Sequence, residues 1–189
     1  MLTLFHDYTS PASAVAVARV ERLITDGLAA QIVGIEALGV DMRLPVTVDV
    51  LAELDAVRDQ ARVEGLELLR PPDLPPTAAA HLVEDLARDR GRDAVWRRGC
   101  YRAYWEQSAD IADLAVLSAL AADAGLPAAD VEHVVTDRVA LLAIRQRFAG
   151  HRREGIGGVP LISFDGTLIP GLLADDDLRA LVALGPAAS

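Results

Sequence analysis

The first 38 residues constrain the fold most, because two short apolar runs flank one helical run. Residues 1–5 and 31–38 are short and apolar, and the second run is β-branched at alternate positions, so both are predicted strands. Residues 14–28 are rich in Ala and Val and end near Gly27, which predicts a helix. Strand, helix and strand within about 40 residues form a βαβ unit with parallel strands and a right-handed crossover.

The turn between the first strand and the helix is Thr-Ser-Pro-Ala-Ser at residues 9–13. Ser10 is a good N-cap, and Pro11 suits the first helical position. A helix start exposes unpaired N–H groups and the positive end of the helix dipole, which together stabilise anions and thiolates. We therefore expect any small-molecule chemistry of this chain at this turn.

The middle of the chain is predicted to be mostly helical. Residues 39–47 read as a loop, and an apolar stripe over residues 51–63 predicts a helix closed by Gly65. The proline-rich residues 70–76 predict an extended connector. Five further helices are predicted, of which one is capped by Asp110 and stopped by Gly125, one spans 130–136, and one is capped by Asp137 and ends near Glu154.

The C-terminal part returns to β-structure. Residues 159–164 and 167–169 are predicted strands, joined by the hairpin signal Asp165-Gly166. A last helix begins at Asp175. The predicted order is therefore βαβ, a helical block, then αββα.

This order resembles the DsbA-like thioredoxin-fold family, and four motifs carry the resemblance. Phe-His-Asp-Tyr-Thr-Ser-Pro-Ala-Ser at residues 5–13 is similar to the family's strand-and-turn motif, which contains Cys-Pro-x-Cys. Leu-Pro-Pro-Thr-Ala-Ala-Ala-His at 74–81 resembles a segment of the FrnE-like branch, as does Tyr-Arg-Ala-Tyr-Trp at 101–105 followed by Asp-Ile-Ala-Asp at 110–113. Residues 155–166, Gly-Ile-Gly-Gly-Val-Pro-Leu-Ile-Ser-Phe-Asp-Gly, resemble the signature that contains Gly-Val-Pro.

The resemblance implies an α/β thioredoxin fold with an inserted all-helical subdomain. The chain is then one domain over residues 1–189. Its thioredoxin part covers about residues 1–64 and 138–185, and its helical insertion covers about residues 65–137.

Both cysteine positions of the family motif hold serine, Ser10 and Ser13. Thiol–disulfide exchange needs a sulfur nucleophile and a mixed disulfide, and a hydroxyl forms neither. A dithiol oxidoreductase role at this turn is therefore excluded. Cys100, the single cysteine, rules out an internal disulfide and lies within a predicted helix, where we expect a packed, unreactive residue.

Kappa-class glutathione transferases and 2-hydroxychromene-2-carboxylate isomerases resemble this fold and carry Ser-Pro-x-Ser at the motif. The resemblance implies that Ser10 donates a hydrogen bond to the sulfur of a bound thiol, with Pro11 and Ser13 completing the turn. It also implies a cis Pro160, with the Val159 N–H and C=O holding the peptide part of the thiol. No metal is expected. The implied activity is a thiol-dependent isomerase or transferase with an electrophilic or isomerisable substrate.

Several alternatives stay open. Ser10 could serve only as a helix cap, and the groove could bind a peptide or small ligand without turnover. Residues 171–174, Gly-Leu-Leu-Ala, lack the polar side chain that glutathione-using relatives carry there, although residues 175–177 could take its place. The cofactor is thus glutathione, another low-molecular-weight thiol, or none.

The side chains around the turn have competing interpretations. Asp7 either tunes the site or ends the strand in solvent. His6 is expected to be structural, and Tyr101, Tyr104 and Trp105 are expected in the core. The arginines at positions 145, 147, 152 and 153 are expected on a solvated face.

Charge and hydropathy limit the partners. The formal net charge is -10, with 28 acidic and 18 basic residues, which argues against nucleic-acid and anionic-membrane partners. No apolar run approaches the roughly 18–20 residues of a membrane span, and no signal peptide is apparent at the start. We expect a soluble cytoplasmic protein, and a homodimer stays open.

Overall fold

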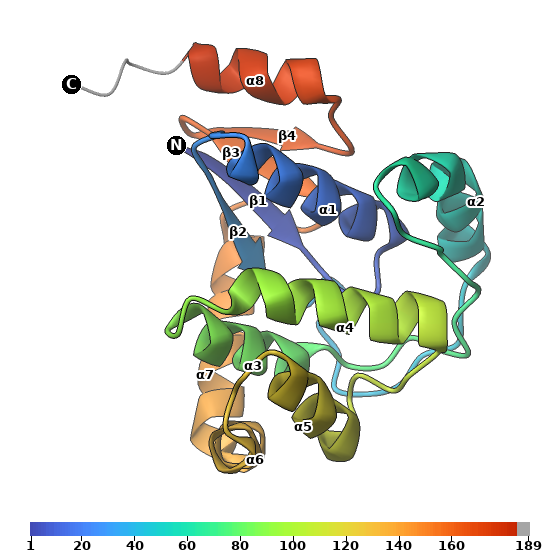
Figure 1. Cartoon of the computed structure of the whole chain (residues 1–189), viewed down its shortest axis with the longest axis vertical. Coiled ribbons are helices and arrows are strands. Elements are labelled where there is room, and N and C mark those ends of the chain that lie inside the picture. Colours follow the sequence, from blue (N-terminus) through green and yellow to red (C-terminus); the bar gives the residue numbers. More distant parts are fainter. Residues whose placement is uncertain (185–189) are drawn as a thin grey trace.

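The computed structural model describes residues 1–184 and contains a mixed four-stranded sheet with the order β2-β1-β3-β4 (Figure 1). The strands are β1 (Leu2–His6), β2 (Ala30–Gly34), β3 (Leu161–Phe164) and β4 (Thr167–Pro170). β1 runs parallel to β2 and antiparallel to β3, and β3 pairs antiparallel with β4. The predicted βαβ unit and C-terminal hairpin are therefore confirmed.

Helices cover both faces of the sheet because the strands alternate their side chains. Leu2 and Leu4 of β1 enter the larger apolar cluster, which includes α1 (Pro11–Thr25) and Leu178 of α8 (Asp175–Ala183). Phe5 points to the other face and packs in a second cluster with Phe148 of α7 (Arg138–Arg153). The core thus lies on both sides of the central strand β1.

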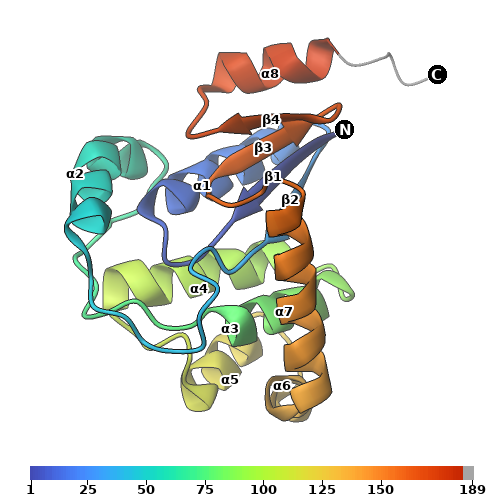
Figure 2. The same ribbon diagram turned by 180° about the vertical axis from the view of Figure 1, so that it is seen from behind.

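Four of the remaining helices, α3 to α6, form a group beside α7 below the sheet in Figure 1, whereas α2 lies beside α1. The bounds of these helices are α2 (Val48–Val63), α3 (Ala78–Arg88), α4 (Asp93–Gln107), α5 (Leu114–Asp123) and α6 (Ala128–Thr136). Figure 2, from behind, shows α2 apart from that group, and it packs instead against α1. None of the helices in the described range is long and apolar enough to cross a membrane.

The predicted cap of α5 is wrong by one turn. Asp113, not Asp110, has the extended backbone of an N-cap, and its carboxylate accepts hydrogen bonds from the N–H groups of Ala115 and Val116. Asp110 begins a turn that precedes the helix, accepts from the Ala112 N–H and pairs with Arg43. Both positions carry Asp, so composition could not separate them.

The second strand is shorter than predicted and ends at Gly34. A Cβ at Gly34 would overlap the ring of His81, so the strand can approach α3 closely only through a glycine. Beyond it, the Glu36 carboxylate accepts from the N–H groups of Thr77 and Ala78. The chain therefore leaves the sheet to meet the start of α3. The predicted domain boundary at residue 185 lies outside the described residues.

Candidate functional site

The turn after β1 forms the helix start that the sequence predicts. Ser10 caps α1, and its Oγ accepts a hydrogen bond of 3.1 Å from the Ser13 N–H. Pro11 occupies the first helical position. Ser10 is half-buried, whereas Pro11 and Ser13 are buried, and the Ser13 Oγ accepts from the Asp7 N–H at 3.5 Å. Of this turn, the Ser10 hydroxyl is therefore the group placed to meet a ligand.

A groove runs past this turn and is lined by three of the five predicted site residues, Ser10, Val159 and Pro160. Ser10 and Val159 line a hollow of about 140 Å³, and Val159 and Pro160 line a neighbouring hollow of about 730 Å³. The Val159–Pro160 peptide bond is cis, as expected. Val159 therefore lies between the two hollows and faces both.

The groove also presents backbone groups without partners. Among the described residues, neither the N–H nor the C=O of Val159 makes a backbone hydrogen bond, and the Ala12 N–H at the start of α1 has none either. Ala12 and Val159 line the larger hollow. These groups give the groove two donors and one acceptor for an incoming ligand.

Glu53 of α2 lines both hollows and was missed by the sequence analysis. It shares one helix face with Val50 and Val57, which line the hollows beside it, since these positions recur at helical spacing. Burial raises the pKa of the Glu53 carboxyl. The only available signal was spacing, because Glu53 lies three residues after Val50 and four before Val57.

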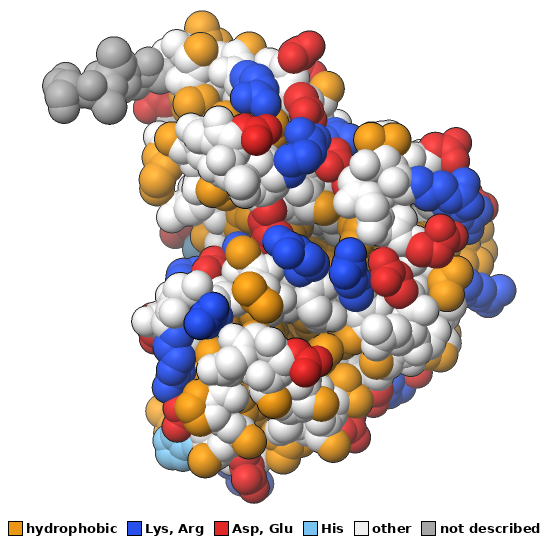
Figure 3. All heavy atoms as spheres, viewed as in Figure 1, with side chains coloured by type: hydrophobic (Ala, Val, Ile, Leu, Met, Phe, Trp, Pro, Cys, Tyr) orange, Lys and Arg blue, Asp and Glu red, His pale blue; other side chains and the backbone are white. Residues whose placement is uncertain are grey.

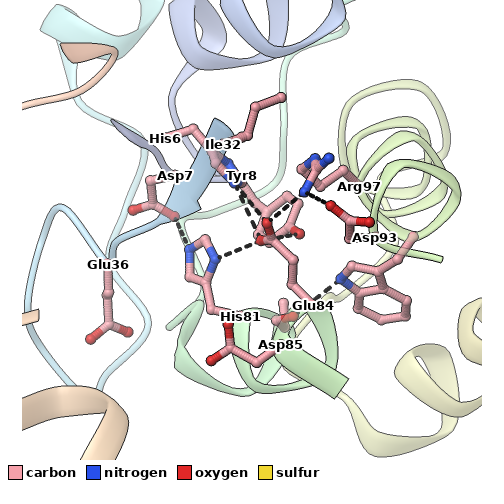
Figure 4. Close-up of polar contacts among 12 residues, drawn as sticks. His6, Asp7, Tyr8, Ile32, Glu36, His81, Glu84, Asp85, Asp93 and Arg97 are labelled. Carbon is pink, nitrogen blue, oxygen red and sulfur yellow. Dashed lines mark hydrogen bonds and ion pairs between the residues drawn. The ribbon is translucent and has the colours of Figure 1, made fainter. Parts of the chain in front are cut away.

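A buried polar cluster lies behind the turn, and Glu84 of α3 is at its centre (Figure 4). The Tyr8 hydroxyl donates to Glu84 Oε2 at 2.9 Å, and Arg97 donates to Oε1 at 3.1 Å. His6 Nε2 and His81 Nδ1 each lie 3.2 Å from Glu84 Oε2. Tyr8, His6, His81, Glu84 and Arg97 are all buried, so these contacts are shielded from water.

The pKa values of the two histidines in this cluster are shifted in opposite directions. Burial lowers the pKa of His81, but hydrogen bonds to Asp7 and Glu84 outweigh burial and raise the pKa to about 9. Burial also lowers the pKa of His6, and there the nearby Glu84 only partly offsets it. Burial raises the pKa of Glu84, yet the histidines and Arg97 outweigh it and hold that pKa well below its usual range.

Asp7 joins the cluster to the turn. Its Oδ1 lies 3.5 Å from His81 Nε2, and its Oδ2 accepts from the Ala37 N–H at 2.8 Å. Its carbonyl accepts from the Ser10 N–H and from the Tyr101 hydroxyl, each at 3.2 Å. Asp7 is buried, so of the two interpretations left open the solvated strand end is excluded. The carboxylate is stable inside the protein because His81, the Ala37 N–H and the Thr9 hydroxyl replace its water.

The aromatic and cysteine predictions are confirmed. Tyr101, Tyr104 and Trp105 are all buried, and the Trp105 indole donates to the Tyr8 carbonyl at 3.0 Å. Cys100 is fully buried, and burial raises the pKa of its thiol well above the ordinary value. A thiol kept protonated inside the core is a packed residue rather than a nucleophile.

His6, His81 and Glu84 are also the one group of metal-ligand type in the described range, with ligand atoms within 4.8 Å of one another. Both Glu84 oxygens, however, already accept from Tyr8 and Arg97. A cation would have to displace the Arg97 guanidinium, so the cluster fits an ion-pair network better than a metal centre.

Asp175, one of the three residues that could replace the missing polar side chain near residues 171–174, pairs with Arg22 at 2.9 Å. One prediction about the arginines needs correction. Arg152 is not simply solvated, because its guanidinium donates to the Glu36 carbonyl at 2.7 Å. Figure 3 shows basic and acidic side chains interspersed over the face of α1 and α4, without the basic stripe of a nucleic-acid surface.

A model of the DSBA-like thioredoxin domain family matches residues 1–183. Probable DsbA oxidoreductase SCO1869 from Streptomyces coelicolor is 22% identical with a TM-score of 0.82, and the match covers 100% of this chain and 92% of that one. These matches confirm the expected α/β thioredoxin fold with inserted helices. Among curated proteins, no sequence matches this chain.

Two further solved structures are similar in fold. A 2-hydroxychromene-2-carboxylate isomerase is 18% identical, with a TM-score of 0.77 and coverage of 96% of this chain and 92% of that one. The cytosolic disulfide reductase DsbM from Pseudomonas aeruginosa, solved with glutathione, is 20% identical, with a TM-score of 0.66 and coverage of 96% of each chain. The neighbours thus include an isomerase and a glutathione-bound reductase.

Proposed function

The chain belongs to the DSBA-like thioredoxin domain family, and within it we propose a thiol-dependent isomerase or transferase. With a single cysteine, the protein has no Cys-x-x-Cys pair. The nucleophilic sulfur is therefore supplied by a low-molecular-weight thiol, such as glutathione, and the substrate is a small electrophilic or isomerisable molecule.

The position of Ser10 on the groove carries this proposal. A serine hydroxyl has one donor and two acceptor lone pairs. The Ser13 N–H uses one lone pair, which leaves the hydroxyl hydrogen to donate to a sulfur anion in the groove. The helix start adds its positive dipole and the unpartnered Ala12 N–H. Both favour the thiolate over the thiol.

The remaining residues of the turn position this hydroxyl. Pro11 and Ser13 are buried behind it, and Ser13 holds both Ser10 and the backbone of Asp7. Across the groove, the N–H and C=O of Val159 are open to pair with a peptide-like part of the thiol, as a strand would. Pro160 supports this segment from within the core.

The test is a titration of the protein with reduced thiols, followed by amide NMR at Ser10, Ala12 and Val159. Saturable shifts confined to these amides support the proposal. Ser10→Asp separates helix capping from thiolate binding. Asp caps a helix about as strongly as Ser does, but its negative charge repels a thiolate. We expect Ser10→Asp to fold normally and to lose at least tenfold in thiol affinity.

The matched control is Asp113→Ala, which removes the cap of α5, a helix that contributes no residue to either hollow. It costs about 1 kcal/mol of stability and is expected to leave thiol affinity unchanged. Unchanged affinity in Ser10→Asp would refute the role of Ser10. No shift with any thiol at millimolar concentration would refute the proposed function.

A second candidate function rests on the larger hollow. Its wall at residues 157–160 could receive a peptide or small ligand without turnover, as a redox-inactive binding protein would. A panel of thiols and electrophiles distinguishes the two, because the binding protein gives ligand-induced shifts near Val159 but no product.

A further inference from the structure

We propose that the groove selects a thiol without carboxylates that carries an amine, and that Glu53 is the residue that pairs with this amine. This inference rests on the proposed function, because it names the class of thiol that the Ser10 site accepts. It assigns a specificity role to a side chain on α2, outside the turn and outside the family motifs.

The position of Glu53 is the first argument. It lines both the hollow beside Ser10 and the hollow beside Pro160, so a ligand that spans Val159 passes its side chain. Its neighbours on the same face of α2, Val50 and Val57, are apolar. Glu53 is therefore the single polar feature on that wall of the groove.

The charge of the lining is the second argument. Among the described residues that line the two hollows, Glu53 is the only ionisable one, and no arginine is present. Glutathione carries two carboxylates, and a site that binds carboxylates normally supplies cations or polar donors for them. Here its carboxylates would meet a fixed negative charge, while its amine would be attracted.

The state of Glu53 is the third argument. The carboxyl is half-buried, and it makes no side-chain hydrogen bond or ion pair within the described part of the chain. Asp175, by contrast, is already paired with Arg22 and Arg19 on the α8 side of α1. A partly desolvated carboxylate without a partner gains from a ligand that brings a cation.

The experiment compares ligands that share one scaffold and differ at the carboxylates or at the sulfur, and the Glu53 variants separate the effect of charge from that of the added ethyl groups. Glutathione has two carboxylates, its diethyl ester has none and keeps the amine, and the S-methyl diethyl ester also lacks the free thiol. Affinities are measured by calorimetry and amide NMR for wild type, Glu53→Gln and Glu53→Lys. Asp59→Asn, an exposed carboxylate on the same helix, is the control.

We expect wild type to bind the diethyl ester roughly tenfold more tightly than glutathione, since each exposed charge pair contributes up to about fivefold. The preference should shrink toward equality in Glu53→Gln, reverse in Glu53→Lys and persist in Asp59→Asn. Equal affinities in wild type, or the same ratio in Glu53→Gln, would overturn the inference while leaving the thiol site intact.

The S-methyl ester separates this inference from the proposed function. If it binds as tightly as the free thiol and still depends on Glu53, the charge selection stands and the thiol-dependent function fails. If the free thiol binds far better but without any dependence on Glu53, the function stands and the inference fails. If no member of the set binds, both are overturned.

Discussion

The free energy of unfolding should pass through a maximum near pH 6.5, because folding raises the pKa of one buried histidine and lowers the pKa of another. His81 has a folded-state pKa of about 9 against an ordinary value of 6.5. The contribution of protonated His81 to the free energy of unfolding is therefore fully present below pH 6.5, and it is lost as the pH rises through 9. The gap between the two pKa values corresponds to about 3 kcal/mol, of which about 2 kcal/mol is lost between pH 6.5 and about pH 8.5.

His6 acts on the other side of the maximum. Its folded-state pKa is lowered from 6.5, so the unfolded chain binds a proton that the folded protein excludes. Stability therefore falls as the pH drops below 6.5. The carboxylates of Asp7 and Glu84, whose pKa values are lowered, lose their contribution only in more acidic solution.

The assay is urea unfolding followed by tryptophan fluorescence, since Trp96 and Trp105 are both buried. Measurements at constant ionic strength should stop near pH 8.5, because ionisation of the Cys100 thiol in the unfolded chain begins to contribute near 9.0. His81→Gln should remove the alkaline slope. His133→Gln, at an exposed histidine, should keep it.

Two results would contradict this reasoning. One is a free energy of unfolding that stays constant or rises between pH 6.5 and about pH 8.5. The other is the same alkaline slope in wild type and His81→Gln. If that variant does not fold, the imidazole signals of His81 in the wild-type protein report its titration directly, and a midpoint below 7 would refute the argument.

Four further substitutions test the fold. Glu84→Gln should cost about 3–5 kcal/mol in urea unfolding, because it leaves buried cations without their carboxylate. Gly34→Ala should destabilise by about 2 kcal/mol or more, because the new Cβ meets the ring of His81, whereas Gly99→Ala, with open space at its Cβ, should be neutral or stabilising by up to about 1 kcal/mol. Asp113→Ala should cost about 1 kcal/mol in the same assay through the lost cap of α5.

The sequence could predict those features that depend on neighbours along the chain. Residues three or four positions apart determine three such features: the cap at Ser10, the helix start at Pro11 and the turn after Phe164. The cap of α5 was misplaced because Asp110 and Asp113 offer the same local signal, and tertiary contacts decide between them. Local chemistry thus predicted the elements and the turn, but not every boundary.

The parts that sequence reasoning missed depend on distant pairs. His6 and Glu84 lie 78 positions apart, and nothing near either residue indicates that they meet. The sequence left open whether the Asp7 side chain is solvated, and its contact with the buried His81 shows that it is not. Glu53 faces the groove only because α2 packs against α1. A charged residue in a helical stripe is usually solvated, so its role is visible only in the folded chain.

Under the proposed function, two requirements of the turn explain why serine suits position 10. The helix start needs an acceptor for the Ser13 N–H, and a thiolate in the groove needs a donor. Alanine offers neither, and aspartate offers the acceptor but adds a negative charge. Serine meets both needs with different parts of one hydroxyl, its lone pair and its hydrogen. Under the proposed function, the turn keeps its fold and binds a sulfur anion, while the reactive thiol belongs to the ligand.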